Sequence, residues 1–489
     1  MATDDEHYTV VINGTRETFT INKRYKVIRK VGSGSYGTVC SALRLGSDEV
    51  VAIKKCSRIF DKKLLTKRCL REIKLLQHFN GHPRIIGLKE LDIVDYSRFN
   101  EIYLIQQCCD TTLADIIHSK LELEPVHYQW FMYQIFTALK YIHSANVLHR
   151  DLKPANILVN QDCSLRICDF GMARGFAGAS ARLDAQQHMT HYVVTRWYRA
   201  PEIMLSRNSY DKAIDIWSVG CIFAELLGRK VLFRGEDYVD QLHKIIGILG
   251  LPKDTSFWDK RASESVVDYI KNLTDANGER PPTEPIDFAA QFPQCPPEGI
   301  DLLRRLLHLD PDQRLTVEEA LEHPYVAVVR DPAEELRCET PFDFESFELL
   351  NDTDVLRQCI INEVQRFKGE HARQSSLRLN SVDMLTPKRR YTGSSISTPT
   401  SVTATEAHHQ AIALDQQHRD VNMCEPEEPA ESGMLFESDQ FVGEPEDMDD
   451  EELKMLGSDE YIRMDHRRKL VGPSGTDKQA LERHLSHDW

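Results

Sequence analysis

The sequence changes character near residue 370, and this change limits most strongly what the chain can fold into. From His371 to Trp489 it carries 23 acidic and 13 basic residues, a net charge of −10, and only five aromatic residues. Between Glu425 and Glu452 there are 13 acidic residues and no Lys or Arg. Mutual repulsion and the shortage of large apolar side chains oppose collapse into a core. We therefore expect residues 371–489 to form a disordered acidic tail.

Composition excludes several classes of protein. The chain has 489 residues, of which 28% are charged, and a net charge of −16, so direct binding of nucleic acid is not expected. The most apolar helical stretch, Ile214–Leu227, is interrupted by two acidic residues and is too short to cross a bilayer, so we expect no membrane partner. Asp4–Glu6 stands where a secretory signal needs basic and apolar residues. The 12 cysteines form no paired metal-binding pattern, which favours reduced thiols and a cytoplasmic and nuclear location.

Residues 25–325 consist of two parts that differ in predicted secondary structure. The first part is β-rich. Turns separate its short strand-like segments, which lie at Tyr25–Val31, Thr38–Leu43, Val50–Lys54 and Glu101–Ile105, and one amphipathic helix lies at Leu64–His78. The second is mainly helical, at Tyr128–Ser144, Tyr210–Leu227 and Tyr238–Leu249. This order predicts an α+β fold with a small β-rich lobe at about 25–108, a helical lobe at about 109–325, and a ligand cleft between them. Residues 1–24 and 326–370 are predicted to be extensions of this domain.

A glycine-rich loop lies early in the β-rich part. Gly32-Ser33-Gly34-Ser35-Tyr36-Gly37 fits the pattern G-x-G-x-x-G, which an ordinary glycine-rich hairpin would also fit. A nicotinamide-binding fold needs a helix after this loop, whereas a strand follows here, and no P-loop sequence of an ATPase occurs in the chain. Because glycines let backbone N–H groups approach phosphate oxygens closely, the loop suits a lid over nucleotide phosphates.

Lys54 and Glu72 follow this loop on a strand and on the amphipathic helix. Taken alone, they would be interpreted as a surface ion pair. Beneath a glycine lid, the lysine can reach the phosphates and the carboxylate can fix the position of the lysine.

The most specific signal is His149-Arg150-Asp151-Leu152-Lys153-Pro154-Ala155-Asn156 followed by Asp169-Phe170-Gly171. With the glycine loop and Lys54, these segments resemble the eukaryotic protein kinase family across residues 25–325. The resemblance implies the two-lobed protein kinase fold, with ATP and Mg²⁺ as cofactors. It also implies that Ala200-Pro201-Glu202 closes the activation segment, with Arg314 pairing Glu202, and that Asp215 anchors the catalytic loop.

The resemblance assigns roles within the cleft. Asp151 is expected to accept the substrate hydroxyl proton, Lys153 to steady the γ-phosphate, and Asn156 and Asp169 to bind Mg²⁺. The predicted nucleotide site comprises the glycine loop (Gly32, Ser33, Gly34, Ser35, Tyr36, Gly37), Val39, Ala52, Lys54, and the backbone of Gln107 and Cys109 after the gatekeeper Gln106. Thr112 stands where relatives usually have an Asp that contacts ribose.

A subfamily is also indicated. Thr190–Glu202 resembles the T-x-Y activation lip and substrate loop of mitogen-activated protein kinases, and Lys140–Ala145 and Glu319–Tyr325 are similar to the fungal cell-wall-integrity branch. The resemblance implies a proline-directed serine/threonine kinase that is activated when an upstream dual-specificity kinase phosphorylates Thr190 and Tyr192. The resemblance also implies that Thr195, in the same loop, is one of the catalytic residues. His191 replaces the usual Glu, which leaves the identity of the activator open.

Charged residues outside the cleft complete the prediction. Phosphate on Thr190 is expected to bind Arg71, Arg150 and Arg174, and phosphate on Tyr192 to bind Arg196 and Arg199. Glu348, Asp352 and Asp354 resemble an acidic docking patch for activators, phosphatases and substrates such as transcription factors. The alternative for this patch is a solvated helix cap.

A rival function stays open at this point. A catalytically dead scaffold could bind nucleotide and docking peptides without transferring phosphate. The presence of Lys54, Asp151, Asn156 and Asp169 argues against it, whereas the unusual residues Thr112 and His191 keep it open. The sequence does not name the specific substrates or the role of the acidic tail.

Overall fold

The computed structural model describes residues 6–12, 17–34, 37–176, 196–205, 211–259, 262–275, 278–383 and 470–471. Apart from residues 377–383, which belong to a second unit, the described residues form one compact unit that comprises the described part of residues 1–376 and the short strand at 470–471. Within the described residues, no helix is both long enough and apolar enough to cross a membrane. Most of the predicted acidic tail, at 384–469 and 472–489, lies outside the described residues.

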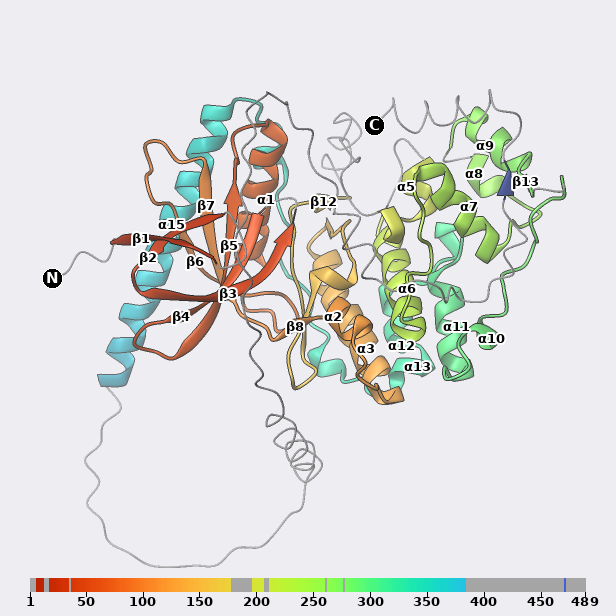
Figure 1. Ribbon diagram of the computed structural model, residues 1–489, viewed down its shortest axis with the longest axis horizontal. Coiled ribbons are helices and arrows are strands. Elements are labelled where there is room, and N and C mark those ends of the chain that lie inside the picture. The colour runs from red at the N-terminus through yellow and green to blue at the C-terminus, as the bar shows by residue number, and fades with distance from the viewer. Residues whose placement is uncertain are drawn as a thin grey trace, which may run out of the picture. The chain divides into compact units, whose positions relative to one another are not determined.

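The β-rich lobe is built on a five-stranded antiparallel sheet with the strand order β3-β4-β5-β7-β6 (Figure 1). Its strands are β3 (Tyr25–Gly34), β4 (Gly37–Arg44), β5 (Glu49–Ser57), β6 (Leu88–Asp92) and β7 (Glu101–Gln107). Alternate side chains point to opposite faces of a strand, so each face has its own apolar set. Ile102 and Leu104 of β7 belong to the core that also contains Ile73 and Leu76 of α1 (Lys63–His78).

The other face of the sheet is covered by an N-terminal hairpin that sequence reasoning did not foresee. Strands β1 (His7–Val11) and β2 (Thr18–Asn22) pair antiparallel. Phe19 and Ile21 of β2 are buried in a second apolar cluster with Val51 and Ile53 of β5. The backbone N–H of residue 20 also donates to the Tyr103 hydroxyl at 2.9 Å. The N-terminal extension is therefore an integral layer of this lobe.

The second lobe is mainly helical, which confirms the predicted two-lobed α+β fold. Its helices are α2 (Leu113–His118), α3 (Pro125–Ser144), α5 (Pro201–Leu205), α6 (Ala213–Gly228), α7 (Tyr238–Leu249), α8 (Ser256–Asp259), α9 (Glu264–Lys271), α10 (Phe288–Gln291), α11 (Pro297–Leu306), α12 (Val317–Glu322) and α13 (Pro324–Ala327). Helix α6 is buried from Ile214 to Leu227, as its apolar sequence predicts. Because it is apolar on nearly every side, it serves as the centre of this lobe.

Short strands position residues of the predicted site. β8 (Thr111–Thr112), β10 (Ile157–Val159) and β11 (Leu165–Ile167) form one small sheet, and β9 (Val147–Leu148) pairs with β12 (Arg174–Gly175). A separate two-stranded sheet is formed by β13 (Thr274–Asp275) and β14 (Leu470–Val471). In the β9–β12 pair, Arg174 lies opposite Leu148. This pairing brings the chain after Asp169 back to the chain before Asp151.

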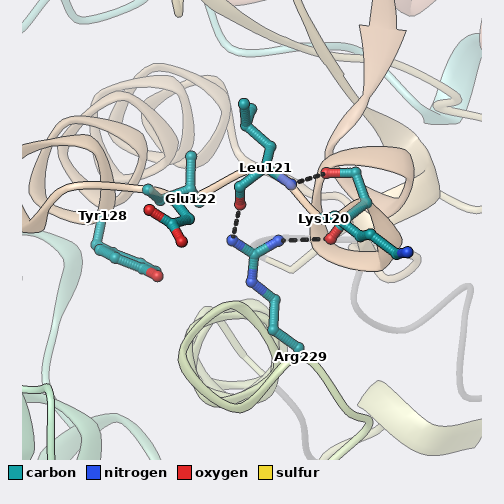
Figure 2. A pocket seen from close by; sticks show the side chains of 7 residues that line it. Lys120, Leu121, Glu122, Tyr128 and Arg229 are labelled. Carbon is teal, nitrogen blue, oxygen red and sulfur yellow. Dashed lines mark hydrogen bonds between the residues drawn. The ribbon is translucent and has the colours of Figure 1, made fainter.

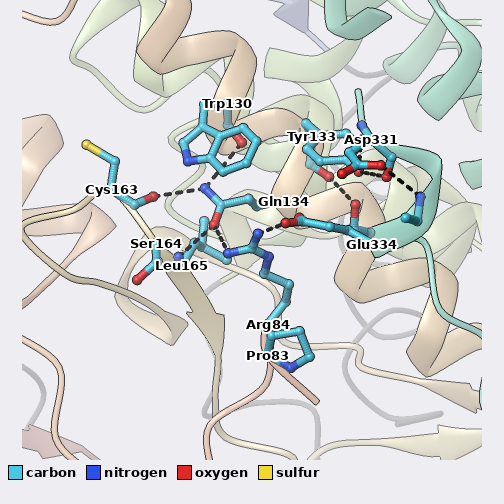
Figure 3. A network of polar contacts seen from close by, with 12 residues as sticks. Pro83, Arg84, Trp130, Tyr133, Gln134, Cys163, Ser164, Leu165, Asp331 and Glu334 are labelled. Carbon is cyan, nitrogen blue, oxygen red and sulfur yellow. Dashed lines mark hydrogen bonds and ion pairs between the residues drawn. The ribbon is translucent and has the colours of Figure 1, made fainter. Parts of the chain in front are cut away.

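The C-terminal extension returns to both lobes. Arg84, which precedes β6, donates to the Gln134 side chain of α3 at 2.6 Å and pairs with Glu334 of the extension at 2.6 Å (Figure 3). The extension then forms α14 (Glu345–Glu348) and α15 (Thr353–Asp383). Helix α15 continues past residue 370, where we placed the start of the tail. The boundary was expected because few large apolar residues follow residue 370. A helix can nevertheless continue through such a segment when it contains no proline.

A buried ion pair joins α5 to the segment before α12. The two Nη atoms of Arg314 donate to the two carboxylate oxygens of Glu202 at 2.6 and 3.1 Å, and both side chains are at most 1% exposed. The guanidinium also lies 5.0 Å from the ring centroid of Trp217. The sequence-based pairing of these two residues is confirmed.

We predict that Glu202→Gln lowers the free energy of unfolding by about 3–5 kcal/mol, because it leaves the Arg314 charge buried without its partner. Denaturant titration would measure the change. The matched control is Asp259→Asn, which breaks the half-exposed pair with Lys271 and should cost less than about 1 kcal/mol. Equal losses in the two variants would contradict the structural importance of the buried pair.

Candidate active site

The centre of the candidate site is a set of charges that joins β5, α1 and the segment after β11. The Nζ atom of Lys54 lies 2.6 Å from Glu72 Oε1 and 3.6 Å from Asp169 Oδ1. Burial by itself would lower the pKa of the Lys54 ammonium, but the carboxylates of Asp169 and Glu72 raise that pKa well above its ordinary value. The lysine therefore stays charged in its buried position, as a group that neutralises phosphate must.

Strand register aligns the predicted nucleotide-site residues of the sheet. Gly32 of β3 lies opposite Val39 of β4, and Val39 lies opposite Lys54 of β5. Ala52 lies opposite Gln106, at the β7 end from which the hinge leaves. Ser33 and Gly34 end β3, whereas Ser35 and Tyr36 at the tip of the loop lie outside the described residues.

Gly37, at the start of β4, shows why the loop needs glycine. Its φ is +151°, and a Cβ atom there would lie 1.8 Å from the carbonyl oxygen of Lys55. Any other residue would collide with the backbone of β5. The close approach of the two strands at this point therefore depends on a residue without a side chain.

Helix α6 holds the catalytic loop in place through Asp215. The Asp215 carboxylate accepts hydrogen bonds from the backbone N–H groups of His149 and Arg150, each at 2.9 Å, and contacts His143 Nε2 at 2.9 Å. Burial would raise the pKa of Asp215, but the hydrogen bond with His143 and the neighbouring donors hold it below its ordinary value. Arg150 has a φ of +66°, a left-handed conformation that costs free energy and persists only when its surroundings enforce it. Asp215 provides that enforcement, as its predicted anchoring role requires.

Two predicted catalytic-loop side chains converge on Asp151. Asn156 donates through Nδ2 to Asp151 Oδ2 at 2.9 Å, and Lys153 Nζ lies 3.2 Å from the same oxygen. These contacts fix the orientation of the carboxylate. A hydroxyl group placed against it could lose its proton to Asp151, with Lys153 close enough to face an approaching phosphate.

Asn156 and Asp169 have the chemistry of a partial magnesium site. Asn156 uses Nδ2 for its hydrogen bonds to Asp151, which leaves its amide oxygen as a possible ligand. Burial would raise the pKa of Asp169, but Lys54 and Lys153 hold it below its ordinary value, so the carboxylate is ionised. No cluster of three or more His, Cys, Asp or Glu side chains suited to a metal occurs in the described part of the chain. Two oxygen ligands fit Mg²⁺, which usually takes its other ligands from phosphate and water.

The hinge follows β7. Gln106 is buried at the end of this strand, and the N–H of Gln107 donates to the Gly87 carbonyl at 2.9 Å. Thr112 forms the N-cap of α2, where its hydroxyl donates to Asp115 Oδ2 at 2.7 Å. This cap explains how Thr112 is stabilised in the fold. Contacts of Gln107 and Cys109 with adenine, and the effect of Thr112 on ribose, stay predictions.

The predicted docking acids do not stay together on the surface. Glu348 is only 3% exposed, and its Oε1 accepts a hydrogen bond from Arg71 Nε at 2.7 Å. The expectation that Glu348 is an exposed docking residue is therefore wrong, because α14 directs this side chain into the protein. Asp352 and Asp354 are exposed at the start of α15, where Asp352 accepts the N–H groups of Asp354 and Val355. Helix capping, the open alternative, thus applies to Asp352.

The predicted phosphate-binding arginines fall into two groups. Arg71 is fully buried, and Arg174 is buried on β12 beside the catalytic loop that carries Arg150. Arg196 and Arg199 converge on Tyr238, each with its guanidinium carbon 5.7 Å from the ring centroid. Thr190, Tyr192 and Thr195 lie outside the described residues, so their contacts with these arginines stay predictions.

A polar pocket of about 420 Å³ lies away from the predicted residues (Figure 2). It is lined by the segment from Ser119 to Leu123, Tyr128 and Arg229. Arg229 donates to the carbonyl oxygens of Ile116 and Leu121 at 2.7 Å each. The guanidinium therefore satisfies a carbonyl group in the last turn of α2 and another in the segment that follows this helix, which is a structural role.

Comparison with known proteins agrees with this geometry. The protein kinase domain family matches residues 25–326. Mitogen-activated protein kinase spm1 of Cytospora mali is 50% identical over 355 residues, which are 72% of this chain and 81% of that protein. For mitogen-activated protein kinase mpkA of Aspergillus fumigatus the identity is 49% over 362 residues (73% and 82%), and for SLT2/MPK1 of Saccharomyces cerevisiae it is 48% over 356 residues (72% and 71%). The chain therefore belongs to the mitogen-activated protein kinase family of serine/threonine kinases and is similar to its fungal members, as its motifs predicted.

Proposed function

We propose that this kinase transfers the γ-phosphate of ATP to Ser/Thr-Pro sites and acts in a cell-wall-integrity or stress cascade. The observation that carries the proposal is Lys54 held between the carboxylates of Glu72 and Asp169, together with the oriented carboxylate of Asp151. Phosphoryl transfer depends mainly on positioning and charge neutralisation, and these residues provide both. The fungal relatives support the type of cascade. Cytoplasmic and nuclear location, with transcription factors among the substrates, is part of the proposal.

Each residue of the proposed active site has a different role in the reaction. Bound Mg²⁺ would neutralise charge on the phosphate oxygens, with Asn156 and Asp169 as its protein ligands. Lys54, held by Glu72, would orient the phosphates. Asp151 would accept the proton of the attacking hydroxyl while Lys153 faces the transferred group. The catalytically dead scaffold remains the second candidate. Of the two residues that keep it open, Thr112 caps α2, and His191 lies outside the described residues.

We predict that Lys54→Met and Asp151→Asn each reduce transfer of radioactive phosphate from ATP to a Ser-Pro peptide by at least about 100-fold, because each removes a pre-positioned group. Lys55→Met is a matched control for the first variant. Lys55 is the next residue on β5, but it pairs with Glu101 at 2.9 Å and is not part of the set of charges that contains Lys54. We expect turnover of the control within about tenfold of wild type after correction for folded protein. Near-normal turnover of both test variants would favour the scaffold.

We further propose that an upstream dual-specificity kinase activates the chain at Thr190 and Tyr192. The two arginines gathered at Tyr238 support this, since a phosphate beside them could form charge-assisted hydrogen bonds. His191 lies between the two sites and is not needed for either set of bonds.

We predict that Thr190→Ala and Tyr192→Phe each remove most activated turnover. His191→Glu should change the turnover of the doubly phosphorylated enzyme by less than about tenfold, or 1.4 kcal/mol. Mass spectrometry would establish the phosphorylation state before rates are compared. Equal rates for phosphorylated and unphosphorylated wild type would show that this segment is not a switch.

The exposed acids Asp352 and Asp354 are proposed to attract basic docking peptides. We predict that Asp352→Asn with Asp354→Asn weakens peptide binding at low salt, and that the difference shrinks as ionic strength approaches physiological values, where the Debye length is about 8 Å. Asparagine keeps the side-chain oxygen that caps α15. Asp254→Asn with Asp259→Asn is the control, because it removes two exposed charges elsewhere, one of which also accepts a backbone N–H. Identical affinities of the test variant and wild type at low salt would exclude the docking role.

A further inference from the structure

Arg71 connects three parts of the chain that are far apart in sequence. This residue precedes Glu72 on α1, and its side chain is fully buried. Its Nε donates to Glu348 of α14 at 2.7 Å, and its Nη1 donates to the carbonyl oxygen of Gly171. One guanidinium thus ties the helix of Glu72 and the segment of Asp169 to the C-terminal extension.

The surroundings of this guanidinium are strongly positive. Burial lowers the pKa of Arg71, and the neighbouring charges of Arg68 and Arg150 lower it further, whereas Glu348 opposes both. Lys67 of α1 also contacts the end of α14, where its Nζ donates to the backbone carbonyl of Glu348 at 2.6 Å. A buried charge in such surroundings needs a counter-charge to stay in place, and the Glu348 carboxylate supplies one.

The position of Gly171 matters for the reaction because it follows Asp169 and Phe170. Phe170 is fully buried and packs against Phe79, at the end of α1, with ring centroids 5.4 Å apart. Asp169 itself has a φ of +64°, so its backbone is held in a left-handed conformation. A hydrogen bond on the Gly171 carbonyl therefore restrains a strained segment directly beside a predicted metal ligand.

We propose that Glu348 is a positioning residue for phosphoryl transfer. By fixing Arg71, it holds Asp169 at the metal site and keeps Glu72 against Lys54. The inference rests on the proposed function, since it concerns the same reaction. It gives the C-terminal extension, which lies outside the sequence motifs of the active site, a direct part in arranging that site.

The structure offers a matched control for this proposal. Lys74 of α1 pairs with Glu363 of α15 at 2.8 Å. This second ion pair joins α1 to the same extension, and Glu363 is also largely buried, with 12% of its side chain exposed. Neither partner has a hydrogen bond to Gly171 among those found in the described residues. Loss of the Lys74 pair should therefore affect anchoring of the extension without affecting Asp169.

The test compares Glu348→Gln with Glu363→Gln in the full chain, using phosphate transfer to a Ser-Pro peptide and thermal unfolding. For Glu348→Gln we expect kcat to fall about tenfold or more and the half-saturating Mg²⁺ concentration to rise about threefold or more, because a displaced ligand weakens metal binding and alignment. The KM for the peptide should stay within about twofold, since the acceptor site is untouched. Glu363→Gln should change none of these kinetic values by more than about twofold, even if its unfolding temperature falls.

Each outcome bears on the proposal. Equal half-saturating Mg²⁺ for Glu348→Gln and wild type, at a temperature where both are folded, would overturn it and leave the ion pair a purely structural contact. The same increase in both variants would also overturn it. If Glu348→Gln does not fold, Glu348→Asp keeps the charge with a shorter reach and should still raise the Mg²⁺ requirement; no rise would count against the proposal. Lack of transfer by phosphorylated wild type would instead contradict the proposed function.

Discussion

The buried carboxylate of Asp215 is the constraint on which the catalytic arrangement depends. It lies on the apolar helix α6 and accepts two consecutive backbone N–H groups from the catalytic loop. An ionised group in such a position is stable only when donors surround it. The loop supplies these donors and in return is held in the strained conformation that presents Asp151. The core of the helical lobe and the chemistry of the cleft are therefore connected through one side chain.

The same rule organises the other buried charges. Each of three buried pairs joins two different elements of the fold: Lys54 with Glu72, Arg314 with Glu202, and Arg71 with Glu348. Removing one member leaves the other buried without compensation, so each pair acts as a specific link between elements. Exposed pairs such as Lys271 with Asp259 lack this property because water can replace the partner. Buried pairs therefore determine which elements must move together.

Sequence reasoning was most successful where the residue type itself carries the chemistry. Motifs assign roles to Lys54, Glu72, Asp151, Asn156 and Asp169, and the structure brings these residues into contact in two groups that Lys153 connects. It failed for Glu348, because the acids around it have the spacing of an exposed patch and nothing in that spacing reveals a buried arginine. It also missed the hairpin β1–β2, since only the finished sheet shows that its second face needs a cover.

The sequence by itself indicated the reaction class, because the order and separation of its motifs resemble those of protein kinases, and these motifs contain the groups that phosphoryl transfer needs for positioning and charge neutralisation. It also determined the two-lobed fold, since the hydrophobic periodicity changes from strand to helix at the lobe boundary. Only the tertiary structure decided which charges are buried and which face solvent. Burial depends on packing between segments hundreds of residues apart, as Arg71 and Glu348 show, and local sequence contains no record of that distance. In the C-terminal extension, this packing exposes the acids Asp352 and Asp354 and buries the acid Glu348.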